Sequence, residues 1–89
     1  MDKNEFEAQS KAGGYTEFQT KVLDPRKAND RHGHPYAVRG LVLAGAFTVI
    51  EDDKSTSYHP GEVFTVAAGR VHSEEIGTEG AQILVGRKY

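Results

Sequence analysis

Short β-type runs, separated by closely spaced turn signals, constrain the fold of this chain more than any other feature. Residues 15–23 alternate, with Thr16, Phe18, Thr20 and Val22 on one side and charged or amide side chains on the other, which predicts a half-buried strand. Further β-type runs lie at 38–50, 62–66, around residue 72 and at 81–89. Many short strands with frequent turns are typical of an all-β sandwich or barrel.

Glycine, proline and charged residues mark the expected connections. Gly45 interrupts the longest β-type run and predicts a tight turn between two strands. The charged stretch 51–57 predicts a hairpin tip, and Pro60-Gly61 predicts a further turn. Residues 1–14 are polar and end in two glycines, so we expect a loosely ordered segment or a short helix there. The folded domain is therefore expected to span residues 15–89.

Composition excludes several classes of protein. The chain has 89 residues, which is enough for a single domain, and its net charge of −2 argues against a phosphate-driven nucleic-acid binder. It has no cysteine, so neither disulfides nor a thiolate metal site are expected. No apolar run is long enough to span a membrane, and residues 1–14 lack the apolar core of a signal peptide. We therefore expect a cytoplasmic protein.

Two of the four histidines stand two positions apart, at His32 and His34. On a strand, residues at this spacing project to the same face, so both imidazoles could bind one ion. The alternative is a pair of exposed or stacked polar residues without a ligand. The pair alone does not decide between these interpretations.

Two segments of the chain together resemble the paired motifs of the cupin family. The first cupin motif has a His-x-His pair, a glutamate and a glycine, and here His32, His34 and Gly45 match it. Val38 stands near the position where the glutamate would fall. The remaining β-type segments are also similar to those of small single-domain bacterial cupins.

The second cupin motif follows after a short gap. Gly61, Gly69 and His72 match its glycines and its histidine, and Ala67 stands in place of its proline. The resemblance implies an all-β double-stranded β-helix, which is a jelly-roll barrel. It also implies a divalent transition metal ion at the barrel mouth, held by His32, His34 and His72.

The missing glutamate leaves three interpretations of this site open. It could be a three-histidine site, or a carboxylate from elsewhere could complete it, with Asp30 and Glu74 as candidates. In the third interpretation the metal is lost and a polar pocket remains. Neutral imidazoles would leave the full 2+ charge on an ion and up to three open positions, which favours anionic, bidentate oxygen ligands. Imidazole suits Fe, Mn, Ni, Co and Zn alike, so the ligands do not select the metal.

Tyr36 follows the histidine pair and is the candidate catalytic residue, as an acid, a base or a hydrogen-bond donor. Its alternative role is packing at the barrel mouth. We expect a small-molecule ligand and either a metal-dependent oxygenase, isomerase or lyase, or a non-catalytic binding or sensing module. A metal-free barrel that serves self-association is a third hypothesis. A thin core and exposed sheet edges also predict a homodimer that packs through residues 15–23.

Overall fold

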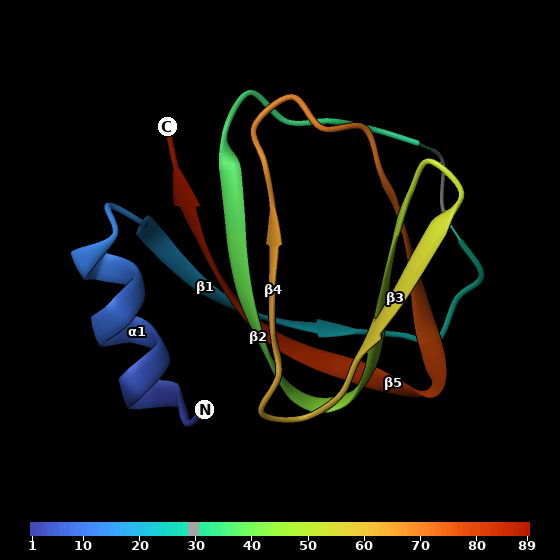
Figure 1. Cartoon of the computed structure of the whole chain (residues 1–89). Coiled ribbons are helices and arrows are strands. Elements are labelled where there is room, and N and C mark those ends of the chain that lie inside the picture. The colour runs from blue at the N-terminus through green and yellow to red at the C-terminus, as the bar shows by residue number, and fades with distance from the viewer. Residues whose placement is uncertain (29–30) are drawn as a thin grey trace.

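A computed structural model describes residues 1–28 and 31–89 of the chain. Within these residues it has one helix and five strands, and all strand pairs are antiparallel. The elements are α1 (Lys3–Ala12), β1 (Thr16–Leu23), β2 (Ala37–Glu51), β3 (Lys54–Tyr58), β4 (Val63–Val66) and β5 (Ser73–Lys88). Figure 1 shows the strands curving around a common centre, so the predicted all-β barrel is confirmed.

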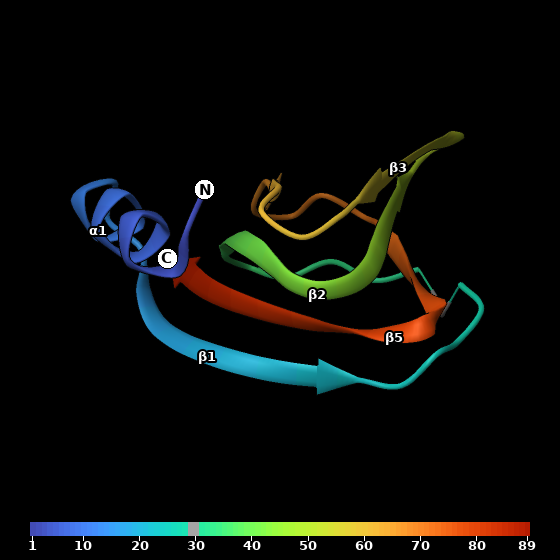
Figure 2. The same ribbon diagram turned by 90° about the horizontal axis from the view of Figure 1, so that it is seen from below.

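Two long, bent strands, β2 and β5, build most of the barrel. They pair with each other along nearly their whole length, and the sheet order is β1-β5-β2-β3. The first half of β2 pairs with β4 on its other edge, whereas the second half pairs with β3. The register between β2 and β5 shifts at two places in the middle, and Figure 2 shows β2 strongly curved. Bending of one continuous strand therefore carries the sheet from one side of the barrel to the other.

Gly45 lies inside β2, so the prediction of a tight turn between two strands at this position is wrong. Its φ of 77° is accessible mainly to glycine, and a Cβ there would collide with the carbonyl oxygen of Gly80 on β5. It sits at one of the register shifts, where a bulge bends the strand. Glycine thus serves a bend with close backbone approach, and the strand continues through it.

The charged hairpin is shorter than its sequence pattern predicts. Glu51 pairs with Lys54, so only Asp52 and Asp53 form the turn, and the rest of the charged stretch belongs to β3. The turn at Pro60-Gly61 is confirmed.

The N-terminal segment forms a helix of ten residues, where the sequence pattern left open a loosely ordered segment or a short helix. Asp2 caps the helix, since its Oδ1 accepts a hydrogen bond of 2.8 Å from the backbone N–H of Glu5. Phe6 and Ser10 lie one turn apart and are both fully buried. Packing of this single face against the sheet orders a segment whose composition is otherwise polar. At ten residues, α1 is too short to cross a membrane, and no other helix occurs in the described part of the chain.

Buried apolar side chains form two clusters on opposite sides of the sheet. The larger cluster fills the barrel and consists of Val42, Phe47, Val49, Phe64, Val66, Ile76, Ala81, Ile83 and Val85. The smaller cluster consists of Phe6, Leu41 and Leu84, with Phe18, Leu43 and Val63 packed at its margin. The smaller cluster joins α1 to the outside of the barrel.

Strand β1 departs from the predicted half-buried face. A register shift between Thr16 and Gln19, with Glu17 at a φ of 56°, changes which side chains point inward. Phe18 packs near α1, but Val22 is 77% exposed, because β1 is an edge strand that α1 covers at one end only. The exposed strand is where the homodimer was expected, and that contact stays a prediction.

Candidate metal centre

Two loops bring the histidines of the first and second motifs together. His32 and His72 exchange both of their backbone hydrogen bonds, each at 2.8 Å, in an isolated bridge. The backbone N–H of Gly69 donates to the carbonyl of His34 at 2.7 Å. The segment before β2 is therefore fastened to the loop between β4 and β5.

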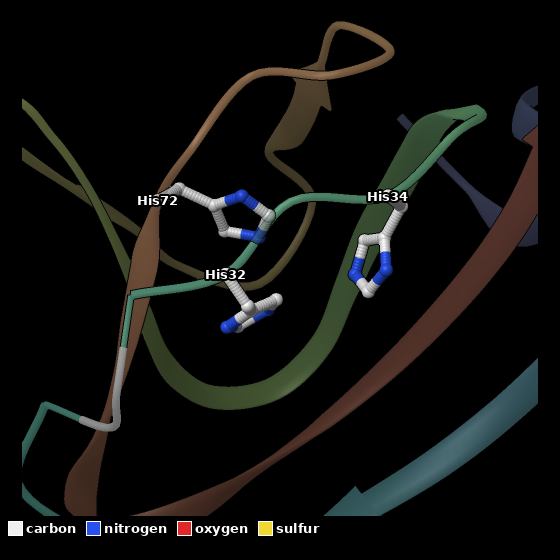
Figure 3. Close-up of side chains that lie close together, drawn as sticks. All are labelled: His32, His34 and His72. Atoms are coloured by element: carbon white, nitrogen blue, oxygen red, sulfur yellow. The ribbon is translucent and has the colours of Figure 1, made fainter.

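The three imidazoles converge on one point, as Figure 3 shows. One ring nitrogen from each of His32, His34 and His72 lies within 4.8 Å of the others. The ring centroids are 4.4 Å apart for His32 and His72 and 5.1 Å apart for His32 and His34. His72 is 2% exposed, whereas the other two are half-buried. The sequence predicts that His32 and His34 project together because both lie on one regular strand. In the structure the two rings do lie close together, but His34 lies in a loop and not on a strand.

Hydrogen bonding orients the most buried of the three rings. His72 Nδ1 lies 3.1 Å from the backbone carbonyl oxygen of Arg70, so this nitrogen donates and Nε2 faces the cluster. Nε2 lies 3.3 Å from Glu74 Oε2, and Glu74 Oε1 lies 3.4 Å from Arg26 Nη2. A carboxylate candidate from the sequence therefore stands directly beside a candidate ligand. The other candidate, Asp30, lies outside the described residues.

The electrostatic environment favours neutral imidazole at His34. Burial lowers the pKa of His34 below its ordinary value of 6.5, and the charges on His32 and His72 lower it further. Neutral imidazole is the form that binds a metal ion. The cluster is thus set up to bind a cation in competition with protons.

The donor set fits a divalent transition metal. Imidazole nitrogens bind such ions at about 2.0–2.1 Å, so two of them on one ion stand roughly 3 Å apart. The observed upper bound of 4.8 Å is within reach of small side-chain rotations. Three neutral nitrogen donors are compatible with several first-row metals and with open positions for a ligand.

A cavity of about 270 Å³ adjoins the histidines. Apolar side chains form part of its lining and Val38 is one of them, so the position without a glutamate does face the cavity. Other parts of the lining are polar and charged. The polar lining residues besides the histidines are Lys21, Arg26, Tyr36, Glu74 and Arg87.

Tyr36 is held in a stack of aromatic and charged groups. Its ring lies parallel to His34, with an interplanar angle of 8° and centroids 4.9 Å apart. The guanidinium carbon of Arg87 lies 4.6 Å from the centroid of Tyr36. Sequence reasoning did not single out Arg87 or Lys21 for the site. Alternation along the last strand is the sequence signal that could have placed Arg87 in the site. Arg87 shares a face with Val85 and Ile83, which point into the barrel.

The fourth histidine, His59, lies outside the cluster. Its Nδ1 is 3.3 Å from Glu62 Oε1, and both side chains are largely exposed. His59 is therefore a matched control for the three clustered histidines.

Solved structures from other organisms share this fold. A protein of unknown function from Rhizobium leguminosarum matches 80% of this chain and 67% of its own, with 18% identity and a TM-score of 0.74. A cupin 2 conserved barrel domain protein from Salinispora arenicola matches 85% and 64%, with 19% identity and a TM-score of 0.72. An oxalate decarboxylase with Mn(II) centres from Bacillus subtilis matches 80% and 20%, with 24% identity and a TM-score of 0.69. Comparison with curated proteins finds no match.

The family assignment comes from a match along the sequence. The model of the cupin domain matches residues 20–85, which cover all five strands in whole or in part together with the three clustered histidines. The predicted resemblance is therefore confirmed, and this chain belongs to the cupin family.

Proposed function

We propose that this cupin binds one divalent transition metal ion through His32, His34 and His72, and that it binds or converts a small oxygenated anion there. One observation carries the proposal, namely the convergence of three imidazole nitrogens within 4.8 Å at the wall of a cavity. A bound ion would supply Lewis-acid stabilisation of negative charge on ligand oxygens.

The residues of the chain provide the surroundings that such chemistry needs. The low pKa of His34 keeps its imidazole neutral and able to bind a cation at neutral pH. Val38 and other apolar residues line the same cavity as the histidines, and such a lining would limit the access of water to a bound ion. Val38 cannot bind a metal ion and carries no charge. The positive charge of a bound ion would therefore not be reduced by a carboxylate at this position, which favours an anionic ligand.

Tyr36 is the candidate acid, base or hydrogen-bond donor of this site. It lines the cavity, and its stacking on His34 holds the ring beside a candidate ligand. A positioned phenol can donate a hydrogen bond to a ligand oxygen or transfer a proton.

The oxalate decarboxylase with Mn(II) centres is consistent with this ligand class, because oxalate is a small bidentate dianion. At 24% identity the likeness establishes the shared fold, and the ligand class stays a proposal for this chain. The three neutral donors are compatible with Mn(II), and equally with Fe, Ni, Co or Zn.

The test is calorimetric titration of oxalate and of short 2-oxo acids into metal-free and Mn(II)-loaded protein. We expect binding to require the metal, and we expect His59→Ala to behave like the natural chain. Equal binding by the metal-free protein would contradict the proposal. Recovery of the ligand after prolonged incubation separates an enzyme, which consumes it, from a binding or sensing module, which returns it unchanged.

A further inference from the structure

The charges that line the cavity do not balance. Three cationic side chains line it, from Lys21, Arg26 and Arg87, against the single carboxylate of Glu74. Arg26 already contacts Glu74 at 3.4 Å. Neither Lys21 nor Arg87 forms an ion pair with any residue that the structure describes. Two positive charges therefore stay available at the wall, in addition to the charge that a metal ion would bring.

The guanidinium of Arg87 is positioned by stacking. It lies 4.6 Å from the centroid of Tyr36, and Tyr36 in turn lies parallel to His34. Stacking uses the flat face of a guanidinium, and although Arg87 also makes a hydrogen bond with the side chain of Tyr89, its other N–H groups remain at the edge to bind a carboxylate. Arg87 thus lies one aromatic ring away from a candidate metal ligand, on the wall of the same cavity.

Lys21 reaches this cavity from the neighbouring strand. It lies on β1 opposite Ile83, while Arg87 lies near the end of β5 opposite Thr16. The register places the two cations on adjacent antiparallel strands, and both side chains line the cavity. A long, flexible lysine can follow a ligand, whereas the stacked arginine provides a fixed contact.

We propose that the ligand of this cavity is a small dicarboxylate, with one end bound at the metal and the second carboxylate bound by Arg87 and Lys21. This inference rests on the proposed metal site. A cavity of about 270 Å³ lies just below the usual range for ligand pockets, which restricts the ligand to a small acid. A monoanion of the same shape would leave both cations without a partner and place a methyl group beside them.

Matched pairs of 2-oxo acids test the second contact. In 2-oxoglutarate and 2-oxopentanoate the distal group is a carboxylate or a methyl on the same carbon chain, and oxaloacetate and 2-oxobutanoate form the corresponding shorter pair. Titrated into Mn(II)-loaded protein, the dicarboxylate of the better-binding pair should bind roughly tenfold to a hundredfold more tightly, as expected for a charge-assisted contact.

Variants assign that preference to the two cations. Arg87→Gln should remove most of the preference for the dicarboxylate and leave binding of the monocarboxylate nearly unchanged, and Arg87→Lys should restore part of it. Lys21→Met should reduce the preference by a smaller factor. Lys88→Gln removes an equal charge from the next residue of β5, whose ammonium lies 5.9 Å from the ring of Tyr15, and should leave the preference intact. Manganese content and melting temperature, measured for each variant, confirm that the site is loaded and folded.

The outcomes separate this inference from the proposed function. Equal affinities within both pairs, or a preference that survives Arg87→Gln, would overturn the dicarboxylate while leaving the metal site in place. Binding of oxalate without binding of any of the four 2-oxo acids would overturn this inference alone, and failure of oxalate and of all four acids to bind the loaded protein would overturn both proposals. A preference lost in Arg87→Gln and kept in Lys88→Gln supports the inference.

Discussion

The two faces of the central sheet are built from alternating residues of the same strands, yet a helix covers part of one face and a cavity adjoins the other. On the outside, Leu41 and Leu84 pack against Phe6 of α1, and Phe6 has no exposed surface. We call this the helix-covered face. Its polar groups are paired as well, since Arg39 donates to Ser10 Oγ at 2.8 Å. The side chains that point inward from the same strands line a cavity of about 270 Å³.

This difference separates the packed face of the sheet from the face on which we propose the metal and ligand site. Where α1 covers it, this face buries Phe6, Leu41 and Leu84 completely or almost completely, so the packing there contributes stability. The cavity face combines unfilled volume, three converging imidazoles and two cations without ion pairs among the described residues. A protein of this size has little core to spare, so volume left open beside charged groups is better explained by a ligand than by stability.

The largest expected effect falls on the helix-covered face. Phe6→Ala should lower the free energy of unfolding by about 3–5 kcal/mol, because a fully buried aromatic ring leaves a hole between helix and sheet. Metal affinity of the remaining folded protein should stay close to that of the natural chain. Chemical denaturation measures the first quantity and metal titration at low temperature the second. A large loss of metal affinity in folded Phe6→Ala would show that the two faces are coupled.

Glu74→Gln tests the carboxylate beside the cluster. Glu74 Oε2 lies 3.3 Å from His72 Nε2, the nitrogen that would bind the ion, so the negative charge of Glu74 should stabilise an ion there, and its carboxylate could also ligate the ion. We expect metal affinity to fall by roughly 10–100-fold, the range for residues that support a ligand. A competition assay with a chelator of known affinity provides the measurement. Unchanged affinity would show that the charge of Glu74 does not support metal binding.

Val38→Glu restores the acid that the first motif lacks. Val38 lines the cavity, so the new carboxylate should tighten metal binding by roughly tenfold, the size of one charge-assisted contact. It should also weaken binding of anionic chelators, because it lowers the positive charge of the site and occupies an open position. Metal titration and a thermal melt of the same variant are needed together. A lower melting temperature without any gain in metal affinity would show that residue 38 belongs to the core and not to the site.

A smaller effect is expected from pH. The folded state lowers the pKa of His34 below 6.5, so as pH falls through this value the unfolded chain takes up the proton first. The contribution of His34 to the stability of metal-free protein is therefore constant above this range, falls through it, and levels off below the folded pKa. Between pH 8 and pH 5.5, the melting temperature should fall less for His34→Gln than for the natural chain. An equal drop in both proteins would contradict the assigned cause.

Local sequence patterns predicted those parts of the fold that depend on alternation and motif spacing. Alternation and turn signals predicted an all-β sandwich or barrel, whereas the convergence of the two motif loops was implied by the resemblance to the cupin motifs. Gly45 misled the prediction because glycine serves turns and bulges equally, and only the approach of Gly80 distinguishes the bend. The polar composition of residues 1–14 left a short helix and a loosely ordered segment equally open, although Asp2, Glu5 and Gly13 are ordinary capping signals.

The parts of the site that escaped prediction depend on which strands become neighbours. Lys21 and Arg87 are distant in sequence and enter one cavity because β1 pairs with β5. The register shift near Glu17 also changes which side chains of β1 point into the barrel. The alternation of polar and apolar residues in the sequence gives no clear sign of this change. Side chains brought together by pairing and by bulges therefore require the structure.

Metal content is the measurement that tests the central claim most directly. Protein purified without added metal is analysed for elements as the natural chain, as His72→Ala and as His59→Ala. The account predicts about one transition metal ion per chain in the natural protein, little in His72→Ala, where the most buried of the three imidazoles is gone, and an unchanged content in His59→Ala. Equal trace amounts in all three proteins would contradict it, because the cluster of His32, His34 and His72 would then hold no ion.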